Sequence, residues 1–216
     1  MTLSHQDKAP ALPSFGDESK ANLFPFALMC AGWIAPLLKF WAVVWDVFRP
    51  SDYVGGDVAP RLWLFLAAFA VSLTPWWLPA SYYRVRRFEQ SGRLYEALGI
   101  RVFRSVVPNG DLVNLWRRRR EPGFRVISNR QSAAEFLSRT VVGEKSHLVL
   151  LLIGAGSSLY AWHIGWNGWA AYLGVANVLV NLYPILLQRY TRARIVRLLE
   201  TGGRREARPS ATSGYA

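Results

Sequence analysis

The sequence is short of the residues that build disulfide-bonded and cysteine-ligated metal proteins. It has one cysteine, Cys30, and only three histidines in 216 residues. A single cysteine excludes an intrachain disulfide and a zinc site made of cysteines. Acidic residues are also scarce, 14 against 26 basic ones, which gives a formal net charge of +12. These absences exclude a secreted disulfide scaffold and leave membranes and nucleic acids as the partners to weigh.

Two long segments contain no charged side chain. No Asp, Glu, Lys or Arg lies in 148–164 or in 168–187, and each approaches the length of about 20 apolar residues that crosses a bilayer. Two more apolar runs occupy 23–45, with one charge at Lys39, and 62–83. Together with 51% hydrophobic residues and 10 tryptophans, these runs predict an all-α polytopic membrane protein with four transmembrane helices.

The basic residues are distributed unevenly along the chain. Fourteen of the 26 lie between Arg84 and Lys145, whereas the turn at 165–168 contains none. This asymmetry follows the positive-inside rule and predicts that segment 84–147 and both termini face the cytoplasm. The four consecutive arginines at 117–120 are interpreted as a topology or lipid-headgroup signal, and nucleic acid is not expected as a partner.

The chain is predicted to hold one membrane domain, residues 22–202, between two tails. Residues 1–21 and 203–216 are rich in Ser, Gly, Pro and charge, and this composition predicts disorder because it offers little apolar surface to bury. The polar residues before the first apolar run do not resemble a secretory signal, so that run is expected to remain as a membrane anchor.

The cytoplasmic segment is predicted to contain helices. Four apolar residues recur there at helical spacings among arginines: Val85, Phe88, Tyr95 and Leu98. They predict a basic amphipathic helix that continues from the second span and lies along the lipid headgroups. A second short amphipathic piece follows at 101–107, and residues 112–131 show no clear periodicity. Ser132 and Glu135 match a capping box, which predicts that a helix begins there and runs into the third span.

A lysine inside the first span needs an anionic partner or a path to water. A charged side chain in hydrocarbon is costly. We therefore expect Lys39 to reach an interface with its long side chain, or to pair with Asp46 two turns along the same face. A catalytic lysine is the alternative.

Two ionisable side chains stand at the start of the third span. Glu144 and His147 are three residues apart, so a helix places them on one face. A carboxylate beside an imidazole can fix the ring's tautomer and support it as a general base that takes a proton from a hydroxyl group. The alternative is a polar anchor at the membrane interface. His163 is predicted at the opposite membrane face, so no histidine cluster for a metal is expected.

The fourth span carries polar residues on one face and basic residues at its end. Asn177, Asn181 and Gln188 share a face, where such amides either bond neighbouring helices or line a binding cavity. Pro184 is expected to free backbone carbonyls near the cytoplasmic end. Beyond it, a basic collar suits phosphate or carboxylate groups, or only sets the topology. The collar consists of Gln188, Arg189, Arg192 and Arg194.

Several motifs resemble those of one known family. They are Phe88-Glu89-x-x-Gly92-x-x-Tyr95, Leu98-Gly99-Ile100-x-x-Phe103, Pro108-Asn109-Gly110, Glu144-x-x-His147, and Asn177 through Tyr183-Pro184-Ile185 to Gln188-Arg189-Tyr190-Thr191-Arg192-x-Arg194. Over residues 84–200 the chain resembles the glycosyl-4,4'-diaponeurosporenoate acyltransferase family. The resemblance implies a small integral membrane enzyme that esterifies a sugar hydroxyl of a glycosylated carotenoid acid with a fatty acyl chain.

The resemblance also implies roles for the singled-out residues. His147 is expected to act as general base with Glu144 as its orienter, in the inner (cell) membrane of a bacterium. No cofactor is expected; an acyl donor such as an acyl thioester is the co-substrate, and membrane lipids are partners. The residues predicted to bind substrate are Asn109, Asp111, Asn177, Asn181, Gln188, Arg189, Tyr190, Arg192 and Arg194.

Three positions depart from the family pattern. The usual Pro-Asp-Gly turn carries Asn109, with Asp111 nearby as a replacement for the lost carboxylate, and Leu148 and Thr191 stand where the family has an aromatic residue and an asparagine. These departures keep a second hypothesis open, in which the chain is a non-enzymatic lipid-binding or complex-assembly subunit of a membrane.

Overall fold

The structure is a computed structural model that describes residues 22–23, 25–47, 60–107, 110–123, 125–127 and 129–206. Within these residues the fold is all-helical and contains no strand, which confirms the all-α part of the predicted fold class. Most of both predicted tails lies outside the described residues. Residues 203–206, predicted as the start of the C-terminal tail, are instead the last turn of a helix.

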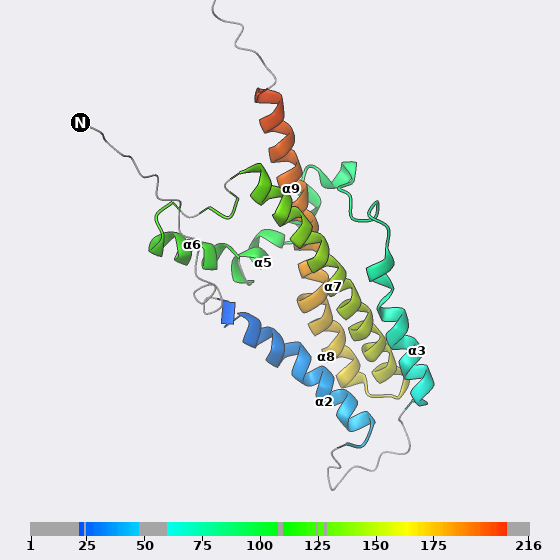
Figure 1. The fold of residues 1–216 in the computed structure, drawn as a ribbon. Helices are drawn as coiled ribbons and strands as arrows, with labels where there is room; N and C mark the ends of the chain where they lie inside the picture. The colour runs from blue at the N-terminus through cyan, green and yellow to red at the C-terminus, as the bar shows by residue number, and fades with distance from the viewer. Residues whose placement is uncertain are drawn as a thin grey trace, which may run out of the picture.

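A long antiparallel hairpin forms the centre of the fold. Helix α7 (Arg130–His163) spans 34 residues, a rise of about 51 Å at 1.5 Å per residue. The chain then turns at Gly165, whose φ of 80° suits a residue without Cβ. It returns along α7 as one helical rod (Figure 1). The rod consists of α8 (Asn167–Asn177), the π-helical turn η4 (Val178–Leu182) and α9 (Tyr183–Glu206).

Two shorter rods pack on the lower half of the hairpin (Figure 1). One is η1 (Cys30–Ile34) followed by α2 (Ala35–Val44), which packs on α8; the other is α3 (Leu62–Ser72) followed by η2 (Thr74–Trp77), which packs on α7. The main core lies between α2, α7 and α8, where Trp33, Phe40, Ala161 and Leu173 are buried. The lower half of the hairpin is thus an apolar core, and it supports the polar residues of the hairpin that are described below.

The described helices offer two candidate membrane spans. Pro25–Val44 and Asn167–Thr201 are long and apolar enough to cross a bilayer, whereas Leu62–Trp77 is shorter. In the run predicted as the second span, 62–83, the α-helix ends at Ser72 and a 3-10 turn with Pro75 follows to Trp77; its bounds as a span stay a prediction. Residues 148–163 of the predicted third span lie inside α7, which confirms the continuous helix expected from segment 84–147 into that run.

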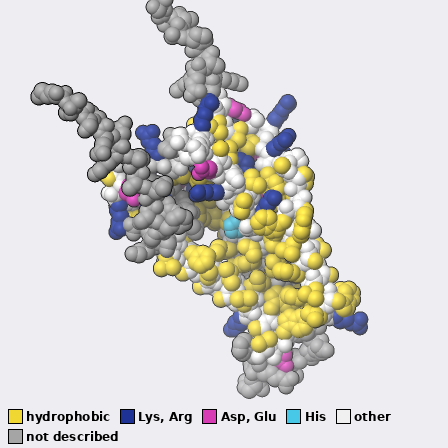
Figure 2. Space-filling model, in the orientation of Figure 1, with side chains coloured by type: hydrophobic (Ala, Val, Ile, Leu, Met, Phe, Trp, Pro, Cys, Tyr) yellow, Lys and Arg dark blue, Asp and Glu magenta, His cyan; other side chains and the backbone are white. Residues whose placement is uncertain are grey.

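Large apolar side chains cover the middle of the molecule. Figure 2 shows a broad hydrophobic band between charged side chains at the upper and lower ends. Many of these apolar side chains are exposed, including Trp63 at 61%, Trp77 at 74% and Leu159 at 63%. Exposed apolar surface of this extent is typical of an interaction with lipid or with another apolar surface.

A proline and a tyrosine fix the bend at the start of α2. Pro36 has no N–H, so the carbonyl of Gly32, four residues earlier, lacks its helical donor. The hydroxyl of Tyr172 on α8 donates to that carbonyl at 2.8 Å. The π-helical turn η1 lies at the same place, and the tyrosine ties this widened turn to the hairpin.

Tyr172→Phe is expected to lower the stability of the bundle by about 1 kcal/mol, because the Gly32 carbonyl loses its donor. Thermal unfolding in detergent measures the change. Tyr183→Phe, which keeps its ring against Phe103, is the comparison variant. An equal melting temperature for Tyr172→Phe and the wild type would contradict the assigned hydrogen bond.

Segment 84–129 folds into short pieces and not into one helix. Its elements are η3 (Arg87–Glu89), α4 (Arg93–Ala97), α5 (Ile100–Val106) and α6 (Asp111–Arg120). The continuous amphipathic helix predicted from Val85 to Leu98 is wrong, because Gly92 with a φ of 72° breaks it. The short helix expected at 101–107 is confirmed as α5, whereas α6 was not predicted.

The start of α7 differs from the predicted capping box. The N-cap is Asn129, whose side chain accepts from the backbone N–H of Ser132, while the Ser132 hydroxyl accepts from the N–H of Asn129. Ser132 is thus the third residue of the helix and not its cap. The amide oxygen of asparagine caps a helix as well as a serine hydroxyl does, so the helix begins after Asn129 and not after Ser132.

Candidate functional site

A buried ion-pair cluster joins the upper parts of α7 and α9. Glu144 on α7 is 0% exposed, and each of its carboxylate oxygens meets one arginine of α9. Arg189 Nε donates to Oε1 at 2.8 Å, and Arg192 Nη2 donates to Oε2 at 2.7 Å. Arg189 and Arg192 are three residues apart, so successive turns of α9 present them to one carboxylate.

The segment between η2 and α7 supplies the second carboxylate of this cluster. Glu89, buried in η3, accepts from Arg189 Nη1 at 3.0 Å and from the Tyr95 hydroxyl at 2.5 Å. Two acidic and two basic side chains therefore balance, and we call Glu89, Glu144, Arg189 and Arg192 the Glu144 cluster. Its arginines also donate to the backbone carbonyls of Tyr82 and Tyr83, which ties the chain after η2 to the hairpin.

The surroundings of Glu89 keep its carboxylate charged. Burial raises the pKa of Glu89, but hydrogen bonds from Tyr95, the backbone N–H of Arg86 and Arg189 lower it, and the net pKa lies below its ordinary value. Burial and the hydrogen bond to Glu89 raise the pKa of the Tyr95 hydroxyl. The tyrosine therefore stays protonated and the carboxylate ionised, as the ion pairs require.

A chain of hydrogen bonds runs from the imidazole of His147 into the bundle. His147 Nδ1 lies 3.2 Å from Asn181 Oδ1. Asn181 Nδ2 donates to Asn177 Oδ1 at 2.8 Å, and Asn177 Nδ2 donates to the backbone carbonyl of Leu151 at 3.0 Å. Both asparagines are buried, at 4% and 0% exposure. We call Asn177 and Asn181 the amide chain.

The last carbonyl of this chain fixes the proton on His147. A backbone carbonyl only accepts, so the amide nitrogen of Asn177 must face Leu151 and its oxygen must face Asn181. By the same step Asn181 turns its oxygen to His147, and Nδ1 of the ring must donate to it. In the neutral ring the lone pair then lies on Nε2. The geometry suits a base that acts through Nε2.

A small residue on α7 makes room for the amide chain. A Cβ atom at Gly154 would lie 2.5 Å from Cγ and from Oδ1 of Asn177 and 2.8 Å from its Nδ2, whereas one at Gly156 would meet nothing within 4 Å. Helix α8 can therefore bring Asn177 against the backbone of α7 only where position 154 has no side chain.

Gly154→Ala is expected to displace Asn177 and to lower the melting temperature of the protein in detergent, with a cost of about 1–3 kcal/mol for overpacking. The matched variant Gly156→Ala adds the same methyl group two residues away. It is expected to be neutral or stabilising, because alanine favours helix by about 1 kcal/mol over glycine. Equal melting temperatures for the two variants would contradict the tight packing at Asn177.

The structure separates the two residues that the sequence placed together. Glu144 and His147 both lie on α7, but Glu144 binds the arginines of α9 and His147 binds Asn181. Among the described contacts no hydrogen bond joins them, so the predicted contact between carboxylate and imidazole is wrong. Asn181 takes the place of the orienting group. The chemical roles of Glu144 and His147 themselves stay predictions.

The predicted substrate-binding residues have mixed surroundings. Arg189 and Arg192 donate hydrogen bonds within the Glu144 cluster. Asn177 and Asn181 donate hydrogen bonds within the amide chain. Gln188 lies against Gly143 of α7, since a Cβ there would be 2.9 Å from Gln188 Nε2. Binding of substrate by these residues stays a prediction.

Four further predicted residues lie outside both groups. Tyr190 is buried and donates to Glu96 at 3.0 Å, and Arg194 is exposed beside the ring of Tyr190. Asp111 binds Arg104 across α5 and α6 at 2.8 Å. Asn109 lies outside the described residues. The structure therefore brings Tyr190 and Arg194 near the Glu144 cluster along α9, and leaves Asp111 on a separate pair of helices.

Sequence reasoning missed three groups of the site. They are Glu89, which binds Arg189, Tyr95, which binds Glu89, and Thr140, which binds Arg192. The signal for the first two was present, because Glu89 and Tyr95 stand in one of the motifs that carry the family resemblance. Nothing in the sequence marks Thr140, whose backbone carbonyl and hydroxyl both accept from Arg192.

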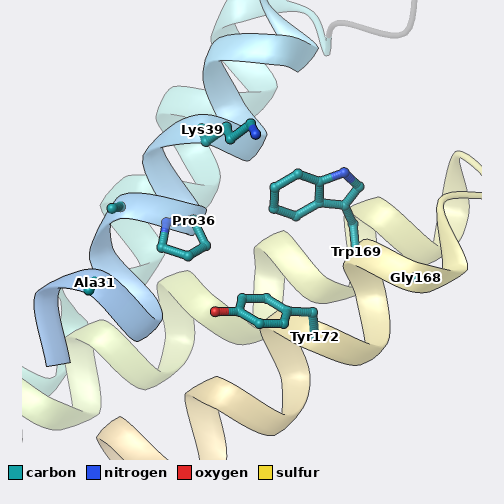
Figure 3. A pocket seen from close by; sticks show the side chains of 7 residues that line it. Ala31, Pro36, Lys39, Gly168, Trp169 and Tyr172 are labelled. Carbon is teal, nitrogen blue, oxygen red and sulfur yellow. The ribbon is translucent and has the colours of Figure 1, made fainter. Parts of the chain in front are cut away.

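Lys39 lines a separate pocket between α2 and α8. The pocket has a volume of about 600 Å³ and is lined by Pro36, Trp169 and Tyr172 among others. Figure 3 shows the Lys39 side chain extending from α2 on the side of the pocket that faces Trp169. Within the described residues Lys39 forms no ion pair, so the predicted partner Asp46 is not its partner there. The described residues also contain no group of three potential metal ligands.

Comparison with known proteins gives one match. A family model described as glycosyl-4,4'-diaponeurosporenoate acyltransferase matches residues 79–201, which is more than half of the chain. No curated protein and no solved structure matches it. The matched segment contains the whole Glu144 cluster, the amide chain and His147.

Proposed function

Because the chain belongs to the glycosyl-4,4'-diaponeurosporenoate acyltransferase family, we propose that it transfers a fatty acyl group to a hydroxyl group of a glycosylated carotenoid or a similar lipid acceptor. The observation that carries this proposal is the amide chain behind His147. It leaves Nε2 unprotonated within the segment that defines the family, and His147 is only partly buried.

The proposed reaction uses His147 as general base. Nε2 takes the proton of the acceptor hydroxyl while the oxygen attacks the carbonyl carbon of the acyl donor. For a thioester donor, the carbon–sulfur bond breaks and the leaving sulfur receives the proton from the imidazolium ring. The products are the ester and the free thiol. Asn181 acts as a positioning residue, because its oxygen accepts the Nδ1 proton throughout.

The Glu144 cluster has a structural role in this proposal. Each carboxylate of the cluster accepts from an arginine of α9, and both arginines also donate to backbone carbonyls. The cluster fixes α9 against α7 one to two turns from His147, and it fastens the chain after η2 to the same place. A base of this kind needs a rigid support, since a small misplacement of the reacting groups lowers the rate steeply.

We also propose a four-span arrangement with the site at the cytoplasmic face. The exposed apolar side chains of α3 and of the lower part of α7 support two further spans beside the two candidate helices. Fourteen basic residues in 84–145 support placement of the upper end of Figure 1 in the cytoplasm. Both termini then lie on that side, in the inner (cell) membrane of a bacterium.

The test is acyl transfer by the purified protein in detergent. A glycosylated carotenoid acid and a long-chain acyl thioester are supplied, and mass spectrometry measures the ester. The proposal predicts an ion heavier than the acceptor by one acyl group, formed in proportion to enzyme. Absence of the ester with every donor, together with recovery of the protein in a stoichiometric complex, would favour the alternative role as an assembly subunit.

A further inference from the structure

A second pocket lies on the side of the hairpin where the chain follows η2. It has a volume of about 600 Å³ and is formed by residues of segment 78–90, α7 and α9. His147 is not among its lining residues. Much of its wall is apolar and comes from all three segments: Leu78, Val85, Leu137, Val141 and Val196. Such a wall suits part of an acyl chain or another apolar group.

Two cations that line this pocket have no carboxylate partner among the residues that the structure describes. Lys145 donates from Nζ to the carbonyl of Trp76 at 3.2 Å and stands beside the rings of Trp76 and Tyr83. Arg84 is exposed, and no ion pair of either residue occurs within the described part of the chain. Arg192 also lines the pocket, but the Glu144 cluster balances its charge. The lining carboxylate is Glu200, exposed on α9.

The position of the pocket in the fold favours an amphiphilic ligand. Trp76 and Trp77, at 46% and 74% exposure, end the apolar rod α3–η2, and Trp76 stands next to Lys145. Exposed tryptophans at the end of an apolar helix are typical of the level of lipid headgroups. A Lys and an Arg that line one pocket favour phosphate oxygens, because the ammonium supplies a point charge and the guanidinium a fork of donors.

We propose that this pocket binds a phosphate-bearing amphiphile, with its phosphate at Lys145 and Arg84 and its acyl chain along the apolar wall. Two molecules carry this chemistry: an anionic membrane phospholipid and a phosphate-bearing acyl thioester. The site does not depend on the transfer reaction, since a chain without transferase activity would bind in the same way.

The test is native mass spectrometry of the full chain in detergent, titrated with phosphatidylglycerol. The wild type is expected to bind one phosphatidylglycerol with preference over zwitterionic phosphatidylcholine. Lys145→Gln and Arg84→Gln are each expected to weaken binding about fivefold, as removal of one cation near a headgroup does. Lys145→Arg is expected to restore it. Arg139→Gln, an exposed arginine of α7 outside the pocket, is the matched control and is expected to bind as the wild type does.

A steric variant separates binding in the pocket from attraction to surface charge. Ala80 lines the pocket and is exposed, so Ala80→Trp is expected to fill the space while both cations remain, and to reduce binding without loss of thermal stability. Displacement of phosphatidylglycerol by palmitoyl-coenzyme A would identify the thioester as the source, and its failure would identify the phospholipid. Binding that is unchanged in the Lys145→Gln and Arg84→Gln double variant, or in Ala80→Trp, would overturn the proposal.

Discussion

His147→Gln is expected to lower the rate of acyl transfer by about 10²- to 10⁴-fold, the usual contribution of a general base. Glutamine keeps a side-chain N–H that can donate to Asn181, so the amide chain is retained. It has no nitrogen that accepts a proton at neutral pH. The substitution therefore removes the base and leaves its support in place. The rate is measured from ester formation in detergent at saturating donor.

The control for this prediction is His163→Gln. His163 ends α7 at the other end of the hairpin and is exposed, so its loss is expected to leave the rate unchanged. Both variants are expected to melt within about 2 °C of the wild type, because neither residue belongs to the buried core. A transfer rate for His147→Gln equal to that of His163→Gln would remove His147 from the mechanism.

Glu144→Gln is expected to destabilise the bundle by about 3–5 kcal/mol, because it leaves two arginines of α9 without their shared carboxylate in a buried site. The substitution keeps the shape of the side chain, so lost packing does not contribute. At this chain length the change corresponds to a fall in melting temperature of about 10 °C. Thermal unfolding in detergent, followed by circular dichroism, measures it.

Glu135→Gln is the matched control on the same helix. Glu135 is exposed, and its contact is a hydrogen bond with Gln131 one turn away. Exposed pairs of this kind contribute little to stability, so its melting temperature is expected to match the wild type. If Glu144→Gln were as stable as Glu135→Gln, the cluster would not hold α9 to α7, and the rigid support assigned to the site would be lost.

The sequence predicts the helices of the hairpin well because their signals are local. Runs without charge at 148–164 and 168–187, and a turn at Gly165, require only neighbouring residues to interpret. The break in the helix at Gly92 is harder to predict, because it depends on a residue that is distant in the sequence. A Cβ at Gly92 would stand 3.1 Å from the ring of Tyr190 on α9, a contact that no periodicity within the segment reveals.

The partners of the site residues could not be predicted from spacing. Glu144 and His147 share a face of α7. Their hydrogen-bond partners, however, are the residues of α9 and η4 that pack against that face. Arg189 and Arg192 come from 45 and 48 residues further along the chain, and Glu89 comes from the segment before α7. The resemblance to the family marked these positions, yet it did not say which of them bind one another. That assignment required the fold.

We infer that the amide chain holds His147 in the tautomer of a general base. Nitrogen-15 NMR of the histidine-labelled protein in detergent reads the proton position directly, and His147→Gln assigns the signal among three histidines. We expect a neutral ring with its proton on Nδ1 in the wild type, and a mixture of tautomers in Asn181→Ala. A proton on Nε2 in the wild type, or a spectrum unchanged by Asn181→Ala, would contradict it.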